Sequence, residues 1–154
     1  MIANLFRILF IFLIISSCSQ KKLIDKFIDF DENGWNSNAP SIFYFSTKDL
    51  NHTTNISFRI RYDISYPYQN FYYGYYVLDS LDTIAKKNLK EIILFDEKNG
   101  KPIGSGISKT FILEEKIIEN LMFKKKSSFS IHIYQMMREE NLLGIKSLGI
   151  LVEK

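Results

Sequence analysis

Hydrophobic and polar residues alternate strictly between Asn55 and Ser65, and this alternation constrains the fold more than any other feature of the sequence. The two alternating sets are Ile56, Phe58, Ile60, Tyr62 and Ile64, and Ser57, Arg59, Arg61 and Asp63. Successive side chains of a β-strand point to opposite faces of a sheet, so a period of two indicates a strand with one buried face and one face in water.

Shorter runs with the same alternation occur along most of the chain. They are Leu23–Phe30, Ser41–Thr47, Phe71–Asp79, Leu89–Asp96, Ile107–Leu113, Phe129–Met136 and Lys146–Val152. Turn-forming residues separate them, for example Asp31–Gly34 and Lys98–Pro102. About eight short strands at this spacing predict an all-β fold, and we expect an antiparallel, jelly-roll-like β-sandwich.

Two stretches are candidates for helices instead. They are Leu81–Leu89 and Glu114–Met122. In the second stretch Ile117, Ile118, Leu121 and Met122 lie near helical spacing, so a helix is an alternative to a strand there.

The N-terminus resembles a lipoprotein signal peptide. An apolar run over Ile8–Ile15 follows Arg7, and it is shorter than the ~20 residues that span a bilayer. It leads into Ile15-Ser16-Ser17-Cys18, which resembles the bacterial lipobox, whose cysteine is acylated. The alternative is a buried N-terminal strand with an incidental cysteine. We predict a signal peptide over residues 1–17, a lipidated tether over 18–22 and a single β-sandwich domain over 23–154.

The residues after Cys18 also carry information about location. No Asp follows the cysteine and no acidic export tag is present, because the tether reads Ser19-Gln20-Lys21-Lys22. The usual signal for retention in the inner membrane is therefore missing. We expect the protein to be lipid-anchored in the outer membrane and to face the periplasm.

Composition and motifs exclude several classes of function. The formal charge of +3 over 154 residues is too small to suggest a nucleic-acid-binding protein. One cysteine and two histidines exclude a zinc centre built from several Cys and His ligands and an intrachain disulfide. The sequence contains no nucleophile elbow and no His-Glu-x-x-His motif. We therefore expect no enzyme activity, no cofactor and no metal.

Aromatic residues are concentrated in the segment Tyr66–Tyr76. Tyrosine combines a large apolar ring with a polar tip, which suits stacking on a sugar ring or on a partner chain. With this reasoning the candidate binding residues are Trp35, Tyr66, Tyr68, Tyr73 and Tyr75. The alternative is that these tyrosines only fill the space between two sheets.

Two adjacent tripeptides suggest a modification. Asp79-Ser80-Leu81 and Asp82-Thr83-Ile84 both fit an Asp-Ser/Thr-apolar pattern, which resembles an O-glycosylation site of exported Bacteroidetes proteins. Ser80 and Thr83 are therefore candidate glycosylation sites.

Taken together, several segments resemble the gliding-motility lipoprotein family GldH of Bacteroidetes over essentially the full length. Besides Cys18, they are Asn33–Asn36 with Pro40, Asn55–Arg61, Tyr66–Asn70, Gln135–Arg138, Leu143–Ile145 and Leu148–Ile150. The resemblance implies a non-enzymatic envelope lipoprotein that is needed for gliding and linked to the type IX secretion machinery. Its expected partners are the membrane and other envelope proteins of that apparatus.

The C-terminal segment that resembles the family admits a structural interpretation. Its marked residues are Gln135, Met137, Arg138, Gly144 and Gly149. We interpret them as a structural corner rather than a contact site, with Arg138 ending a buried strand and the glycines permitting close turns. The leading hypothesis for the whole chain is an anchored adaptor. The alternative is a carbohydrate-binding module, for which a glycan would be the partner.

Overall fold

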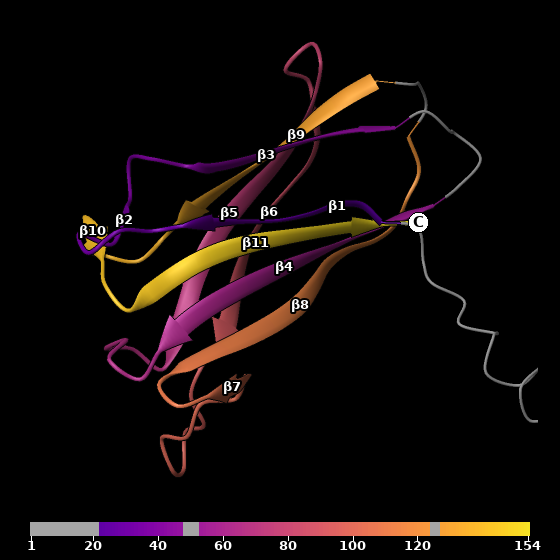
Figure 1. The fold of residues 1–154 in the computed structure, drawn as a ribbon. Helices are drawn as coiled ribbons and strands as arrows, with labels where there is room; N and C mark the ends of the chain where they lie inside the picture. Colours follow the sequence, from indigo (N-terminus) through magenta and orange to yellow (C-terminus); the bar gives the residue numbers. More distant parts are fainter. Residues whose placement is uncertain (1–21, 48–52, 124–126) are drawn as a thin grey trace, which may run out of the picture.

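The computed structural model describes residues 22–47, 53–123 and 127–154. Within these ranges the regular secondary structure is entirely β, in two sheets that face each other (Figure 1). The signal peptide and Cys18 lie outside the described residues, so their assignment stays a prediction.

The first sheet has five antiparallel strands and the second has four. In spatial order the first consists of β1 (Lys22–Asp29), β11 (Ile145–Glu153), β4 (Thr54–Asp63), β8 (Thr110–Leu121) and β7 (Ser105–Ile107). The second consists of β3 (Ser41–Thr47), β9 (Ser127–Gln135), β5 (Asn70–Asp79) and β6 (Ile84–Ile93). A short pair, β2 (Trp35–Asn36) with β10 (Asn141–Leu142), lies at one end of the sandwich (Figure 1).

The eight longer strands are arranged as a jelly roll. If they are numbered one to eight along the chain, one sheet has the order 1-8-3-6 and the other has 2-7-4-5. In this order, strands 1, 8, 3 and 6 of one sheet correspond to strands 2, 7, 4 and 5 of the other, as in the two interleaved Greek keys of a jelly roll. The predicted fold class is confirmed.

The core lies between the two sheets, and the alternation in β4 decides which side chains enter it. Ile56, Phe58, Ile60 and Tyr62 are fully buried. Phe58 stacks on Tyr73 of the opposite sheet with ring centroids 4.2 Å apart. Burying such side chains is the main favourable contribution to folding, at about 1.5–3 kcal/mol each.

Two details of the predicted β4 pattern are wrong. Ile64 is exposed because the strand ends at Asp63, where the carboxylate accepts a hydrogen bond from the backbone N–H of Ser65 at 2.7 Å. Ser57 points away from the core but is also buried, with Leu151 and Lys116 as its register neighbours on either side.

Neither candidate helix forms. Within Leu81–Leu89, residues from Ile84 onward belong to β6, an edge strand with little burial and therefore a weak alternation signal. The stretch Glu114–Met122 is mostly the second half of β8. There Ile56 of β4 pairs with Ile118 and Ser57 pairs with Lys116, so Ile117 is an extra residue in a bulge. Ile117 and Ile118 are both buried, and such a bulge breaks the period of two.

Candidate functional site

Four of the five predicted binding residues lie in the core. Trp35, Tyr66, Tyr73 and Tyr75 have between 0% and 4% of their surface exposed. Their polar tips are satisfied internally, as shown by the Trp35 indole N–H, which donates to the carbonyl of Ala39 at 3.0 Å. The prediction that these four residues form an exposed binding surface is wrong, because they fill the space between the sheets.

Tyr68 differs from this group because its hydroxyl reaches the surface. It is half-buried, packs edge-on against Tyr66 and donates a hydrogen bond to the Glu139 carboxylate. This hydrogen bond raises the pKa of Tyr68. Tyr68 therefore links the β4–β5 connection to the turn after β9.

Tyr73 and Tyr75 of the second sheet form hydrogen bonds to β8 of the first sheet. The Tyr73 hydroxyl donates to the carboxylate of Glu115 on β8 at 3.2 Å, and the Tyr75 hydroxyl donates to the carbonyl of Ile117 at 3.3 Å. Lys90 of β6 completes the cluster with an ion pair to Glu115 at 3.0 Å. Burial raises the pKa of both tyrosines, so they stay protonated donors.

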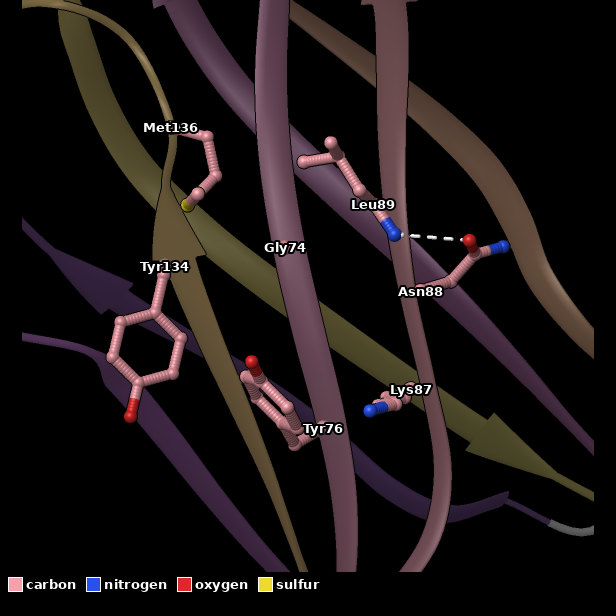
Figure 2. Close-up of a pocket in the computed structure, with 7 residues that line it drawn as sticks. All are labelled: Gly74, Tyr76, Lys87, Asn88, Leu89, Tyr134 and Met136. Carbon is pink, nitrogen blue, oxygen red and sulfur yellow. Dashed lines mark hydrogen bonds between the residues drawn. The ribbon is translucent and has the colours of Figure 1, made fainter.

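The outward face of β5 carries the feature that the sequence analysis missed. Tyr72 and Tyr76 point away from the core, and Gly74 lies between them. A hollow of about 720 Å³ lies over Gly74, which places no side chain in it. Figure 2 shows the residues around it. The hollow is lined by Gly74, Tyr76, Lys87, Asn88, Leu89, Tyr134 and Met136.

The lining combines aromatic, aliphatic and polar groups. Tyr134 and Met136 stand on one side of Gly74 and Leu89 on the other (Figure 2). Tyr76 and Tyr134 meet edge to face with ring centroids 5.8 Å apart. Leu89 is 61% exposed, although most outward positions of a sheet in contact with water are polar. This hollow is the candidate functional site.

Nothing in the local packing requires a glycine at position 74. Its φ is not in the left-handed region, and a Cβ built there would lie 3.7 Å from the Met136 side chain, an ordinary contact. A glycine inside a strand is unfavourable by itself and often marks a place where another molecule approaches closely. The tyrosines around Gly74 in the sequence are the signal from which this site could have been found.

The marked residues of the C-terminal segment make close contacts within the domain. The Gln135 side chain is buried, donates to the carbonyl of Glu139 at 2.6 Å and accepts from the N–H of Met137 at 2.8 Å, which fixes the turn after β9. Gly144 has a φ of 81°, and a Cβ there would lie 2.5 Å from the Cα of Tyr66. The prediction that Arg138 ends a buried strand is wrong. β9 ends at Gln135, and Arg138 is exposed in the turn that follows.

Gly149 has a different role, on the outward face of the first sheet. The Phe27 ring lies across it, and a Cβ at Gly149 would be 2.5 Å from that ring. The guanidinium groups of Arg59 and Arg61 lie 4.6 and 3.8 Å from the ring centroid. Asp25 forms an ion pair with Arg59, and hydrogen bonds from Arg59 and Lys22 lower the pKa of Asp25. These side chains cover the sheet surface around Gly149.

The predicted glycosylation sites, Ser80 and Thr83, are exposed in the turn between β5 and β6. The position is accessible, and the modification stays a prediction. Among the described residues there is no cluster of three His, Cys, Asp or Glu side chains suited to a metal ion. The described part of the chain also contains no helix long and apolar enough to cross a membrane.

The fold is an antiparallel jelly-roll sandwich. The outward face of the first sheet is covered around Gly149 by its own side chains, and that of the second sheet is hollowed over Gly74. The model of the GldH lipoprotein family matches residues 22–152 of the chain. The chain therefore belongs to the GldH lipoprotein family, and the predicted resemblance is confirmed. It is a lipoprotein linked to gliding motility.

A search of curated proteins found no match. Among solved structures, the chain is similar to that in the crystal structure of the infectious bursal disease virus VP2 subviral particle, with 9% sequence identity and a TM-score of 0.38. The match covers 87% of this chain and 31% of the viral one, so the chain spans about a third of that protein.

Proposed function

We propose that this protein is a non-enzymatic adaptor of the cell envelope. The lipid on Cys18 holds it in the outer membrane, facing the periplasm, and the hollow over Gly74 docks another envelope protein of the gliding or type IX secretion apparatus. The observation that carries this proposal is the exposed aromatic and aliphatic lining of the hollow on the outward face of the second sheet. Membership of the family supports the lipid anchor and the link to gliding.

The lining favours a protein partner. Leu89 and Met136 are both more than half exposed, so covering them removes apolar surface from water. Methionine adapts its shape to a partner, and tyrosines such as Tyr76 and Tyr134 often carry much of the binding energy at protein interfaces. A side chain of the partner that enters the space above Gly74 would contact all four residues.

A carbohydrate is the second candidate partner. Tyr76 and Tyr134 offer ring surfaces on which a sugar can stack, and Asn88 and Lys87 supply polar groups at the same hollow. This alternative now rests on Tyr76 and Tyr134 rather than on the buried Tyr73 and Tyr75.

A photo-crosslinking experiment in gliding cells tests the adaptor proposal. A photoreactive amino acid replaces Leu89 in the full-length protein, and the crosslinked products are identified by mass spectrometry. We expect crosslinks to one envelope protein of the motility or secretion apparatus. The same protein should be lost when Gly74→Trp fills the hollow and retained with Gly74→Ala, the matched control.

Other outcomes lead to different conclusions. Crosslinks that are equally strong in the Gly74→Trp variant would show that the hollow is not the docking site. Retention of the purified protein on peptidoglycan or chitin, lost in Gly74→Trp and Tyr134→Ala, would favour the carbohydrate-binding alternative.

A further inference from the structure

One end of the sandwich, where the chain enters the folded domain, carries three exposed apolar side chains. Leu81 is 74% exposed, Met122 is 64% exposed and Ile84 is 50% exposed. Leu81 lies in the turn between β5 and β6, and Met122 directly follows β8. These residues belong to different sheets but lie at the same end, because Asp79, Thr83 and Met122 line one opening of about 570 Å³.

The turn that carries Leu81 is held in a fixed shape. The Asp79 carboxylate accepts hydrogen bonds from the N–H groups of Leu81 and Thr83, at 2.9 and 3.0 Å. The N–H of Asp79 also donates to the carbonyl of Thr83 at 3.1 Å. The turn therefore presents Leu81 to the outside by its own geometry, and the leucine is not exposed merely by fraying.

The same end of the sandwich holds the start of the folded domain. Lys22, the first residue of β1, pairs with Glu153 at the end of β11, and Thr54 pairs with Leu121 at the end of β8. Figure 1 shows the C-terminus beside the start of β1 at this end. Cys18 precedes Lys22 by four residues, a distance of at most about 14 Å even in a fully extended chain.

These observations point to a second membrane contact. We propose that Leu81, Ile84 and Met122 rest in the interface of the bilayer into which the acyl chains on Cys18 insert. The inference depends on the lipid anchor of the proposed function, which brings this end of the sandwich to the lipid surface. A bilayer interface accepts exposed apolar side chains and gains from their burial.

This contact would set the orientation of the molecule. With this end on the bilayer, the strands run away from it. β8, twelve residues from Thr110 to Leu121, would reach about 35 Å from the lipid surface. The hollow over Gly74 then opens sideways, parallel to the membrane plane. A carbohydrate on Ser80 or Thr83 would compete with this arrangement, because it would hold the same turn away from the lipid.

Site-specific fluorescence on the full-length, acylated protein tests the proposal. Cys18 is the only native cysteine and its thiol is acylated, so Leu81→Cys and Met122→Cys each give one thiol for an environment-sensitive dye. Ile107→Cys is the matched control, because Ile107 is 90% exposed at the β7–β8 turn, at the opposite end of β8. The proteins are reconstituted in vesicles of phosphatidylethanolamine and phosphatidylglycerol.

We expect lipid-borne quenchers to act at least three times more strongly on the dyes at positions 81 and 122 than on the dye at 107. Iodide in the water should show the opposite preference. If all three dyes are equally accessible to iodide on protein that floats with the vesicles, this inference is wrong while the lipid anchor stands.

Two further results would also overturn it. If the protein does not float with the vesicles, the anchor at Cys18 fails, and the membrane contact fails with it. If mass spectrometry of protein from gliding cells shows a carbohydrate on Ser80 or Thr83, the turn cannot rest on the bilayer.

Discussion

Gly149 and Gly74 both lie in the middle of a long strand, on the outward side of a sheet, but their neighbours differ. The Phe27 ring covers Gly149 so closely that a Cβ would lie 2.5 Å from it. Over Gly74 a Cβ would make only ordinary contacts, with the Met136 side chain at 3.7 Å and the Asn88 carbonyl at 3.9 Å, and the sheet surface stays hollow. A glycine in a strand thus serves internal packing on one face and leaves room for another molecule on the other.

The largest expected effect comes from replacing Gly149. In Gly149→Val the new side chain displaces Phe27 from the two arginines, and we expect a loss of about 1–3 kcal/mol of folding free energy, typical of overpacking. Chemical denaturation of the purified protein measures it. The matched Gly74→Ala should instead gain about 0.4–1 kcal/mol, because it restricts the unfolded chain at a compatible position. Equal losses in both variants would remove the contrast between the two faces.

Replacing the covering ring tests the same contrast from the other side. Phe27→Ala removes the contacts with Arg59 and Arg61, each worth about 0.5–1 kcal/mol at a partly exposed site. We expect a total loss of about 1–2 kcal/mol. Tyr44→Ala, on the outward face of the second sheet, is the control and should change stability by less than about 0.5 kcal/mol, because Tyr44 is 69% exposed. A silent Phe27→Ala would mean that the ring covers Gly149 without stabilising the sheet.

The smallest effect concerns acid. Hydrogen bonds from Arg59 and Lys22 lower the pKa of Asp25 in the folded protein, so this carboxylate stabilises the fold above its unfolded pKa of about 3.9. The stabilisation is lost as the pH falls through the lowered folded pKa. We expect Asp25→Asn to have a lower melting temperature than the parent protein at pH 7, and the two to converge near pH 2. A constant difference across this range would contradict the assignment.

The fold was largely predictable because alternation survives wherever one face of a strand is buried. The bounds of β3 match the predicted Ser41–Thr47, where no bulge interrupts the pattern. The second half of β8 was misread as a helix, because the bulge at Ile117 and Ile118 places two apolar residues side by side. A bulge depends on the partner strand, which local sequence does not identify.

The binding residues were misassigned for a related reason. Alternation in β5 separates two faces but does not show which of them is the inner one. The predicted residues of this strand, Tyr73 and Tyr75, lie on the inner face. Phe71 and Val77 share the parity of Tyr73 and Tyr75, and these apolar residues mark the inner side. The hollow itself depends on Leu89 and Tyr134, which reach Gly74 only through the pairing of β5 with β6 and β9.

The position of β11 between β1 and β4 affects when the molecule can fold. A ribosome makes residues 145–153 after the other described strands, so the first sheet remains in two parts until β11 is available. A chain that stops before Ile145 would expose the pairing edges of β1 and β4 together with the inner faces of both sheets. Such edges invite aggregation and proteolysis. The strand order thus makes completion of the first sheet wait for β11.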